Sequence, residues 1–246
     1  MRAAADPRRT AATGLLLAGL IFGGWLALHV YALFFHPLSG AGLVAAPFMV
    51  AAICWLDVGL FIVAHDCMHG SLAPGRPRLN RWIGRAALAL YAGFSYDRLL
   101  PKHFDHHRRP GTAEDPDFSA DHPRHFWRWY WAFFRQYFGV REWLILTALV
   151  AFYVLVLRAP YPNLLLFWAL PAILSSLQLF LFGTYLPHRA DESPFHDHHN
   201  ARSNDYGRLV SLLTCFHFGY HHEHHRSPGT PWWRLPAERA RSASPR

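Results

Sequence analysis

The chain has 246 residues, enough for one domain or a small two-domain protein, and its mean hydropathy of +0.05 is close to that of a soluble protein. A net charge of +8 and a pI near 9.8 would suit a nucleic-acid-binding protein. Apolar and charged residues are, however, segregated along the chain in a way that argues against both interpretations. The three cysteines offer neither an even disulfide framework nor a C-x-x-C pair.

Four apolar segments are predicted to cross a membrane, whose hydrocarbon core needs about 20 apolar residues. Residues 12–35 and 160–187 contain no Asp, Glu, Lys or Arg, and residues 37–64 contain only Asp57. Residues 143–157 are also uncharged but form a shorter segment. The first segment is too long for the apolar region of a signal peptide, and another follows closely, so we expect it to remain uncleaved.

Two regions between these segments are predicted to lie at the membrane surface. Residues 82–100 are apolar with Arg85 and Asp97 near the ends, which favours an interfacial helix. Residues 125–138 combine dense aromatic side chains with spaced arginines, which is typical of the headgroup region, although a substrate-lining role stays open. The expected fold class is therefore an all-α integral membrane protein with about four transmembrane helices, interfacial helices and a histidine-rich cytoplasmic cap.

The basic residues predict the orientation of these helices. With the N-terminus inside and four spans, 3 Lys and Arg precede the first span, 12 lie in residues 65–142 and 8 follow residue 188. Only Arg158 falls on the other side, so 23 of the 24 basic residues share one side, as the positive-inside rule requires. The net charge is thus explained without a nucleic acid, and none is expected as a partner.

Eight of the 18 histidines fall into three clusters, each just beyond an apolar stretch. The clusters are His65 and His69; His103, His106 and His107; and His221, His224 and His225. Spacings of three or four residues place imidazoles on one helix face, while an adjacent residue is rotated by about 100° and can reach a second metal. One metal rarely takes more than six ligands, so eight indicate two metals.

His188, at the end of the last apolar segment, is the candidate ninth ligand, or else a helix cap that interacts with the helix dipole. Asp66, Asp105 and Glu223 lie inside the clusters and are expected to accept the second N–H of ligating histidines. His217 shares a helix face with His221 and, like the three carboxylates, is expected to contact the ligands without binding the metal itself. No catalytic side chain beyond the ligands is predicted.

The residues alone leave the metal open. Zinc suits imidazole, but its sites are usually closed with four ligands, or with three and a water. Two irons with nitrogen ligands and open positions for O₂ account better for eight or nine histidines. Other membrane metal enzymes are not excluded by the clusters.

Several motifs together resemble a known family over roughly residues 10–236. They are Ala64-His65-Asp66 with Met68-His69-Gly70-Ser71, His106-His107 with Pro110-Gly111, residues 114–118 (EDPDF), 185–188 (YLPH), 199–203 (HNARS), 212–225 (LLTCFHFGYHHEHH) and 231–236 (PWWRLP). With them the chain resembles the membrane fatty-acid desaturase and hydroxylase superfamily, and within it the bacterial β-carotene ketolase (β-carotene 4-oxygenase) family. Cys67 departs from the expected small residue such as Ala, which should affect packing rather than chemistry.

The resemblance implies a single desaturase-like domain over residues 1–246, with a histidine-bound pair of Fe ions and O₂ as co-substrate. It implies two successive oxidations at C4 of a β-ionone ring, which convert β-carotene through echinenone to canthaxanthin. The carotenoid would enter from the lipid bilayer of the bacterial inner (cytoplasmic) membrane. The chain has no G-x-G-x-x-G fingerprint and no cysteine set for an iron–sulfur cluster, so an external electron donor such as a ferredoxin is implied.

Two other classes of function stay open at this point. A fatty-acid desaturase or hydroxylase, or a carotenoid 3-hydroxylase, would use the same metal chemistry on another C–H bond, because the shape of the channel decides which bond reacts. A non-enzymatic metal carrier or transporter would place its ligands near the middle of the bilayer. Here the clusters lie beyond the ends of the apolar segments.

Overall fold

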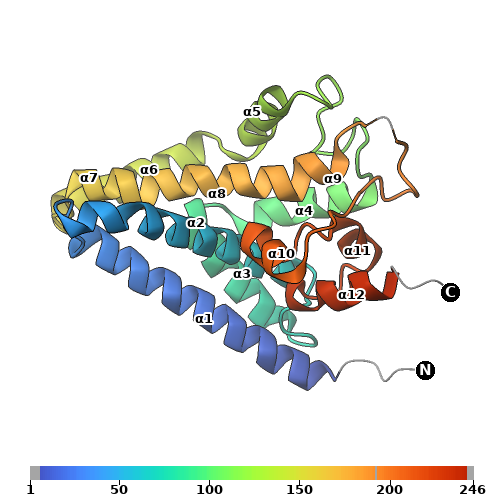
Figure 1. Cartoon of the computed structure of the whole chain (residues 1–246), viewed down its shortest axis with the longest axis horizontal. Helices are drawn as coiled ribbons and strands as arrows, with labels where there is room; N and C mark the ends of the chain where they lie inside the picture. The colour runs from blue at the N-terminus through green and yellow to red at the C-terminus, as the bar shows by residue number, and fades with distance from the viewer. Residues whose placement is uncertain (1–5, 192, 243–246) are drawn as a thin grey trace.

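Three long apolar helices dominate the computed structural model, which describes residues 6–191 and 193–242. They are α1 (Pro7–Phe34), α2 (Ala41–Met68) and a continuous helix over Tyr161–His188. The last consists of α7 (Tyr161–Leu164), η2 (Leu165–Ala169), α8 (Leu170–Phe180), η3 (Leu181–Tyr185) and α9 (Leu186–His188). All three run along the length of the molecule (Figure 1), and each is long and apolar enough to cross a membrane.

The fourth expected span differs from the other three. Residues 143–157 belong to α6 (Val140–Ala151), which continues as the π-helix η1 (Phe152–Val156). This helix qualifies as a membrane span only together with the preceding α5 (Phe126–Tyr137), and the two are bent by 79° at the break between them. By length and composition, the described chain therefore contains three membrane-spanning helices, or four if this bent pair forms one span.

The single interfacial helix expected over residues 82–100 is instead two helices, so that expectation was wrong in detail. They are α3 (Pro77–Ala92) and α4 (Tyr96–Arg108). Gly93 ends α3 in the left-handed conformation, with φ of 69°, and its N–H donates back to the carbonyl of Ala89. Glycine adopts this conformation without steric penalty, whereas the apolar pattern around it gives no sign of the break.

The interior of the molecule holds the polar end of α2 in place. Leu60, Ile62, Val63 and Ala64 are fully buried and belong to a core that includes residues of α1, α3 and the C-terminal segment. Cys67 is buried in the same core and lies against Gly84 of α3. A side-chain Cβ built on this glycine would lie only 3.1 Å from the Cβ of Cys67, so α2 and α3 approach closely here. Cys67, which departs from the family pattern, thus packs at the point where α2 and α3 are closest.

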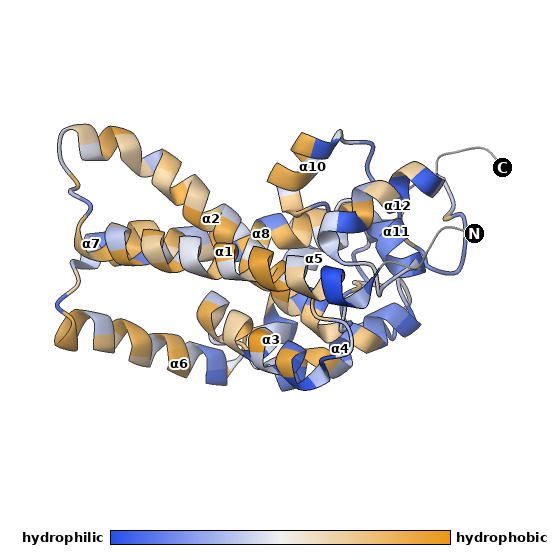
Figure 2. Ribbon diagram, turned by 90° about the horizontal axis from the view of Figure 1, so that it is seen from below, coloured by the Kyte–Doolittle hydropathy of each residue, from blue (hydrophilic) through white to orange (hydrophobic). Residues whose placement is uncertain are grey.

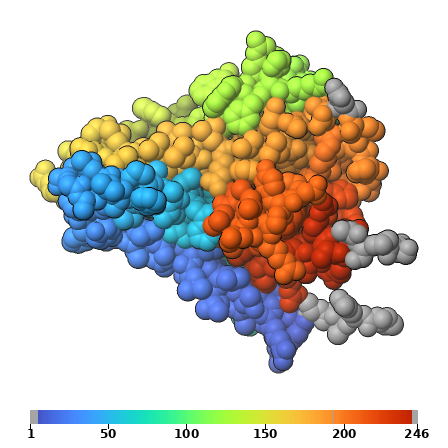
Figure 3. Space-filling view, in the orientation of Figure 1, coloured from blue at the N-terminus to red at the C-terminus, as the bar shows by residue number. Residues whose placement is uncertain are grey.

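Short helices gather at one end of the long ones. They include α4, α10 (Arg208–Cys215), α11 (His221–Arg226), η4 (Trp232–Arg234) and α12 (Leu235–Ser242). Figure 2 shows apolar residues along the long helices and polar residues concentrated at this end, near α4, α11 and α12. In the space-filling view the C-terminal elements lie directly against the end of the α7–α9 helix (Figure 3). All three histidine clusters and His188 lie on elements of this end.

Candidate metal centre

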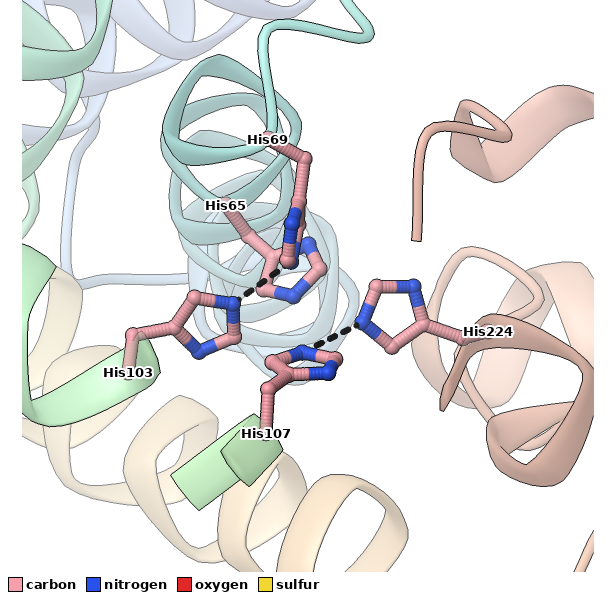
Figure 4. Close-up of side chains that lie close together, drawn as sticks. All are labelled: His65, His69, His103, His107 and His224. Atoms are coloured by element: carbon pink, nitrogen blue, oxygen red, sulfur yellow. Dashed lines mark hydrogen bonds between the residues drawn. The ribbon is translucent and has the colours of Figure 1, made fainter. Parts of the chain in front are cut away.

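Nine imidazole side chains meet at the polar end of the molecule in two groups. Within each group, one ring nitrogen of every member lies within 4.8 Å of those of the others. The five-histidine group is His65, His69, His103, His107 and His224 (Figure 4). The four-histidine group is His106, His188, His221 and His225. These nine are the eight histidines of the sequence clusters and the candidate ninth.

Helical geometry explains this division into two groups. His65 lies in the last turn of α2 and His69 caps it, one turn later on the same face. On α4, His107 belongs to the five-histidine group, whereas its neighbour His106 belongs to the four-histidine group. A rotation of about 100° per residue separates such neighbours. The adjacent pair His224 and His225 of α11 is divided in the same way.

Distances between the ring nitrogens test whether metal ions fit. The Nε2–Nε2 distances are 2.6 Å for His69–His103, 3.0 Å for His107–His224, 3.1 Å for His106–His225, 3.0 Å for His188–His221 and 3.0 Å for His221–His225. With metal–nitrogen bonds of about 2.0–2.1 Å, neighbouring ligands at right angles lie roughly 3 Å apart. The spacing is therefore that of ligands sharing one ion.

Buried imidazole nitrogens without a hydrogen-bond partner also indicate a metal site. Both ring nitrogens of His65 are buried without a hydrogen-bond partner, so the one that faces the five-histidine group is available to a metal. Buried polar atoms are rarely left unsatisfied, and an unsatisfied one in a native protein indicates an ion or water at the site. The chemistry of the donors fits two metal ions, one in each group.

The surroundings keep most of these imidazoles neutral, the form that binds a metal. Burial lowers the pKa of His69 to about 4, and it lowers the pKa of His107 to about 2, with further lowering from neighbouring histidines. The pKa values of His103, His221 and His224 fall well below the usual 6.5 for the same reasons. A neutral set of rings is thus available over the physiological pH range.

His106 is the exception, because Asp115 lies against it. Both carboxylate oxygens of Asp115 accept from Nδ1 of His106, at 2.9 and 3.0 Å, and backbone N–H groups of Gly111 and Asp117 also donate to them. Burial lowers the pKa of His106, but this hydrogen bond and the charges of Asp117 and Asp115 outweigh burial and raise it. The carboxylate fixes the tautomer in which Nε2 faces the four-histidine group.

His188 is oriented by a backbone group. Its Nδ1 donates to the carbonyl of Asn200 at 2.7 Å, which leaves Nε2 directed at His221. Asn200 in turn donates from its side chain to the carbonyl of Pro110, just beyond α4. The loop that carries Asn200 therefore connects α9 to the end of α4.

Asp115 and Asn200 were missed as orienting residues, although both lie in motifs of the family resemblance, residues 114–118 and 199–203. Asp115 comes eight residues after His107 in a loop, where no periodicity links it to the helical clusters. Asn200 acts through its carbonyl, which its residue type does not reveal. In the sequence, only the two family motifs indicated that Asp115 and Asn200 belong to the site.

The residues expected to orient the ligands have other partners in the described chain. Asp66 accepts from the backbone N–H of Trp232, and its Oδ1 lies 3.8 Å from Nδ1 of His65, beyond hydrogen-bond distance. Asp105 forms an ion pair with Arg108. Glu223 accepts from Ser203 and Arg239, and the latter contact ties α11 to α12. The ring of His217 stacks on Tyr220 and Trp232.

An apolar cavity, here called the aromatic cavity, adjoins the five-histidine group. It lies between α2, α3, α4, α5 and α8. Phe61, Phe133 and Leu179 supply apolar wall, and His65 and His103 form its metal-facing end. A smaller adjoining cavity shares these five residues and continues to His106 and His221. The aromatic α5 thus lines the cavity, the role left open beside a headgroup anchor.

Comparisons with a family model and with individual proteins agree on the family of this chain. Residues 38–144 and 126–245 match the fatty acid desaturase family. A β-carotene ketolase of a Paracoccus species is 52% identical over 94% of this chain and 93% of the relative. A β-carotene ketolase of Haematococcus lacustris is 35% identical over 96% and 82%. A zeaxanthin 4-ketolase of Chlamydomonas reinhardtii is 37% identical over 94% of this chain and 54% of that longer protein.

Proposed function

Because the chain belongs to the fatty acid desaturase family and, within it, to the β-carotene ketolases, it is an oxygenase, and we propose that it oxidises C4 of carotenoid β-ionone rings. Two successive oxidations at C4, followed by loss of water, would give the ketone. With both rings oxidised, β-carotene would become canthaxanthin by way of echinenone. The observation that carries this proposal is that an apolar cavity ends at His65 and His103 and continues through an adjoining cavity to His106, His107 and His221, members of both histidine groups.

The proposed cofactors are two Fe ions, one held by each histidine group. When bound, they would supply O₂ activation and the oxidising power needed to break an allylic C–H bond. The residues of the chain have other tasks. Asp115 and the Asn200 carbonyl orient His106 and His188, and the apolar wall excludes water from the space next to His65 and His103.

The aromatic cavity suits the ring end of an apolar polyene. On α8 it is lined by Ser176 and Leu179, and the adjoining cavity continues to Thr184, so the two together span eight residues, roughly 12 Å along the helix at 1.5 Å per residue. In the wall of the aromatic cavity, Tyr130 and Ser176 bond to each other at 2.6 Å and present little polarity to a ligand. A carotenoid dissolves only in the bilayer, so it would enter sideways between the helices.

We place the histidine groups on the cytoplasmic side of a bacterial inner membrane, within one domain that spans the chain. The excess of basic residues on that side supports this orientation. The proposed electron donor is a small acidic protein such as a ferredoxin. Arg108 and Arg109 are exposed and directly follow His107, so they could steer a negatively charged donor toward the metals.

Cells that accumulate β-carotene provide the decisive test. Expression of this chain should convert the yellow carotenoid into the red diketone, with the monoketone as an intermediate, as measured by chromatography and mass spectrometry. A 3-hydroxylated product would instead indicate a carotenoid 3-hydroxylase. An unchanged carotenoid profile with altered membrane fatty acids would favour a fatty-acid desaturase or hydroxylase and overturn the proposal.

Iron retention by the five-histidine group should follow the lowered pKa values of its members. Protons compete with metal for imidazole, so iron should stay bound as pH falls through 6.5, the ordinary histidine pKa, and leave nearer pH 4. In the metal-free protein, the unfolded chain binds more protons than the folded chain between those values, so the free energy of unfolding should fall as pH drops through this window. Iron per chain after dialysis at stepped pH checks the first expectation, and release above pH 6.5 would contradict it.

A further inference from the structure

One carboxylate in the aromatic cavity has no task in the oxidation proposed above. Asp117 lines this cavity together with His65 and His103. Its Oδ1 accepts a hydrogen bond from the hydroxyl of Tyr137 on α5. Within residues 6–191 and 193–242 no hydrogen bond reaches Oδ2, whose closest basic neighbour is Nδ1 of His106 at 3.9 Å.

His106 does not occupy that oxygen. A neutral imidazole carries one N–H, and that of His106 already goes to Asp115 at 2.9 Å. The backbone of Asp117 is also fixed, because its N–H donates to Asp115 and its carbonyl accepts from Trp129. Asp117 is therefore held in place in the cavity wall, and its Oδ2 has no hydrogen-bond donor among the described residues.

The position of Asp117 restricts which part of a ligand it can meet. The other polar pair of the wall consists of Tyr130 and Ser176, which bond to each other, and Ser176 lies twelve residues before His188, roughly 18 Å along the α7–α9 helix. Asp117 instead shares the metal-facing end with His65, where C4 of the ring would lie if it is oxidised there. C3 is bonded directly to C4, so a 3-hydroxyl would lie close by, and burying it here without a partner is unfavourable.

On the premise of the proposed ketolase function, we infer that Asp117 is a specificity-determining residue that accepts a hydrogen bond from the 3-hydroxyl of a hydroxylated β-ionone ring. Tyr137 orients the carboxylate by holding Oδ1, which leaves Oδ2 for the substrate. A hydrogen bond to an ionised oxygen is about twice as strong as one between neutral groups. The enzyme should thus accommodate rings with or without the hydroxyl.

Competition binding without turnover tests this inference. Purified protein in detergent is incubated with equal amounts of β-carotene and zeaxanthin, which has a 3-hydroxyl on each ring, with neither O₂ nor reductant present. The bound carotenoids are extracted and their ratio is measured. Replacement of Asp117 by Leu should lower the zeaxanthin-to-β-carotene ratio about tenfold relative to wild type, as expected for one buried hydrogen bond lost.

Two further variants sharpen the result. Tyr130→Phe removes a polar group from the α5 wall of the same cavity, but one that bonds to Ser176, and should leave the ratio as in wild type. Asp117→Asn keeps the shape and can still pair with a hydroxyl, though without charge, so the ratio should fall only about threefold. The Asn variant also keeps the test decisive if the Leu variant does not fold.

An unchanged ratio in both Asp117 variants would overturn the inference, and so would an equal fall in Tyr130→Phe. Loss of iron from an Asp117 variant with the wild-type binding ratio would assign the residue to support of the metal site instead. None of these outcomes depends on product formation. Failure of the proposed ketolase function would appear separately, as the absence of ketone from wild-type protein supplied with O₂ and reductant.

Discussion

Replacing His224 by Ala should abolish turnover and remove the metal from the five-histidine group, while the protein still inserts into the membrane. His224 is the only member of this group from α11, so its loss opens the side of the site that faces the C-terminal segment. The effect on affinity should exceed the 10–100-fold typical of residues that only orient a ligand. Iron per chain should fall from two toward one, as measured on purified protein.

The four-histidine group offers the complementary variant. His188→Ala should remove the other ion and leave the five-histidine group filled, because the two sets share no residue. His222→Ala is the matched control. It lies on α11 beside the ligands, but its Nε2 bonds to Asp197 at 2.9 Å and it belongs to neither group. Full iron in His224→Ala, or turnover at the wild-type rate, would count against the assignment.

The helical parts of this site could be predicted from the sequence because their spacing is local. A spacing of four residues in His65 and His69, or in His103 and His107, places both rings on one face of any helix. The same rule explains why His106 and His107 point to different groups. The apolar segments likewise revealed three long helices, since length and the absence of charge suffice for that.

Local spacing was misleading for the residues that orient the ligands. Asp105 precedes His106 directly, yet consecutive residues on a helix do not face each other, and Asp105 turns toward Arg108. The partner of His106 comes from a loop nine residues later in sequence, at Asp115. Which loop returns to a helix depends on the packing of the whole end of the molecule, and a single sequence does not encode it in any periodic pattern.

The break between α3 and α4 has a similar origin. Gly93 lies in an apolar stretch that reads as one helix, but α4 must turn to bring His103 and His107 back over the end of α2. A continuous helix from residue 82 to 108 would carry these histidines away from His65. The histidine groups can therefore form only if the helix breaks here. The sequence indicates the break only when one requires the three clusters to meet at one site.

The second large effect is expected from substituting Asp115, with the same substitution at Asp105 as its control. Asp115→Asn should weaken metal binding by the four-histidine group about 10–100-fold. Asp115 is an acceptor for three N–H groups, from His106, Gly111 and Asp117. An amide of the same shape brings its own N–H₂ against one of these donors and removes the charge that fixes the His106 tautomer. Iron would then be lost at correspondingly lower chelator concentration.

Asp105→Asn is the control, because it makes the same chemical change one residue from His106. The Asp105 side chain is partly exposed and, among the described residues, pairs only with Arg108 at the surface, an interaction worth at most about 1 kcal/mol. Iron retention against chelator should therefore match that of the wild-type protein. If Asp105→Asn released iron and Asp115→Asn did not, the sequence-based assignment would stand and the loop carboxylate would lose its role. The opposite result would show that the ligand is oriented from outside its own helix.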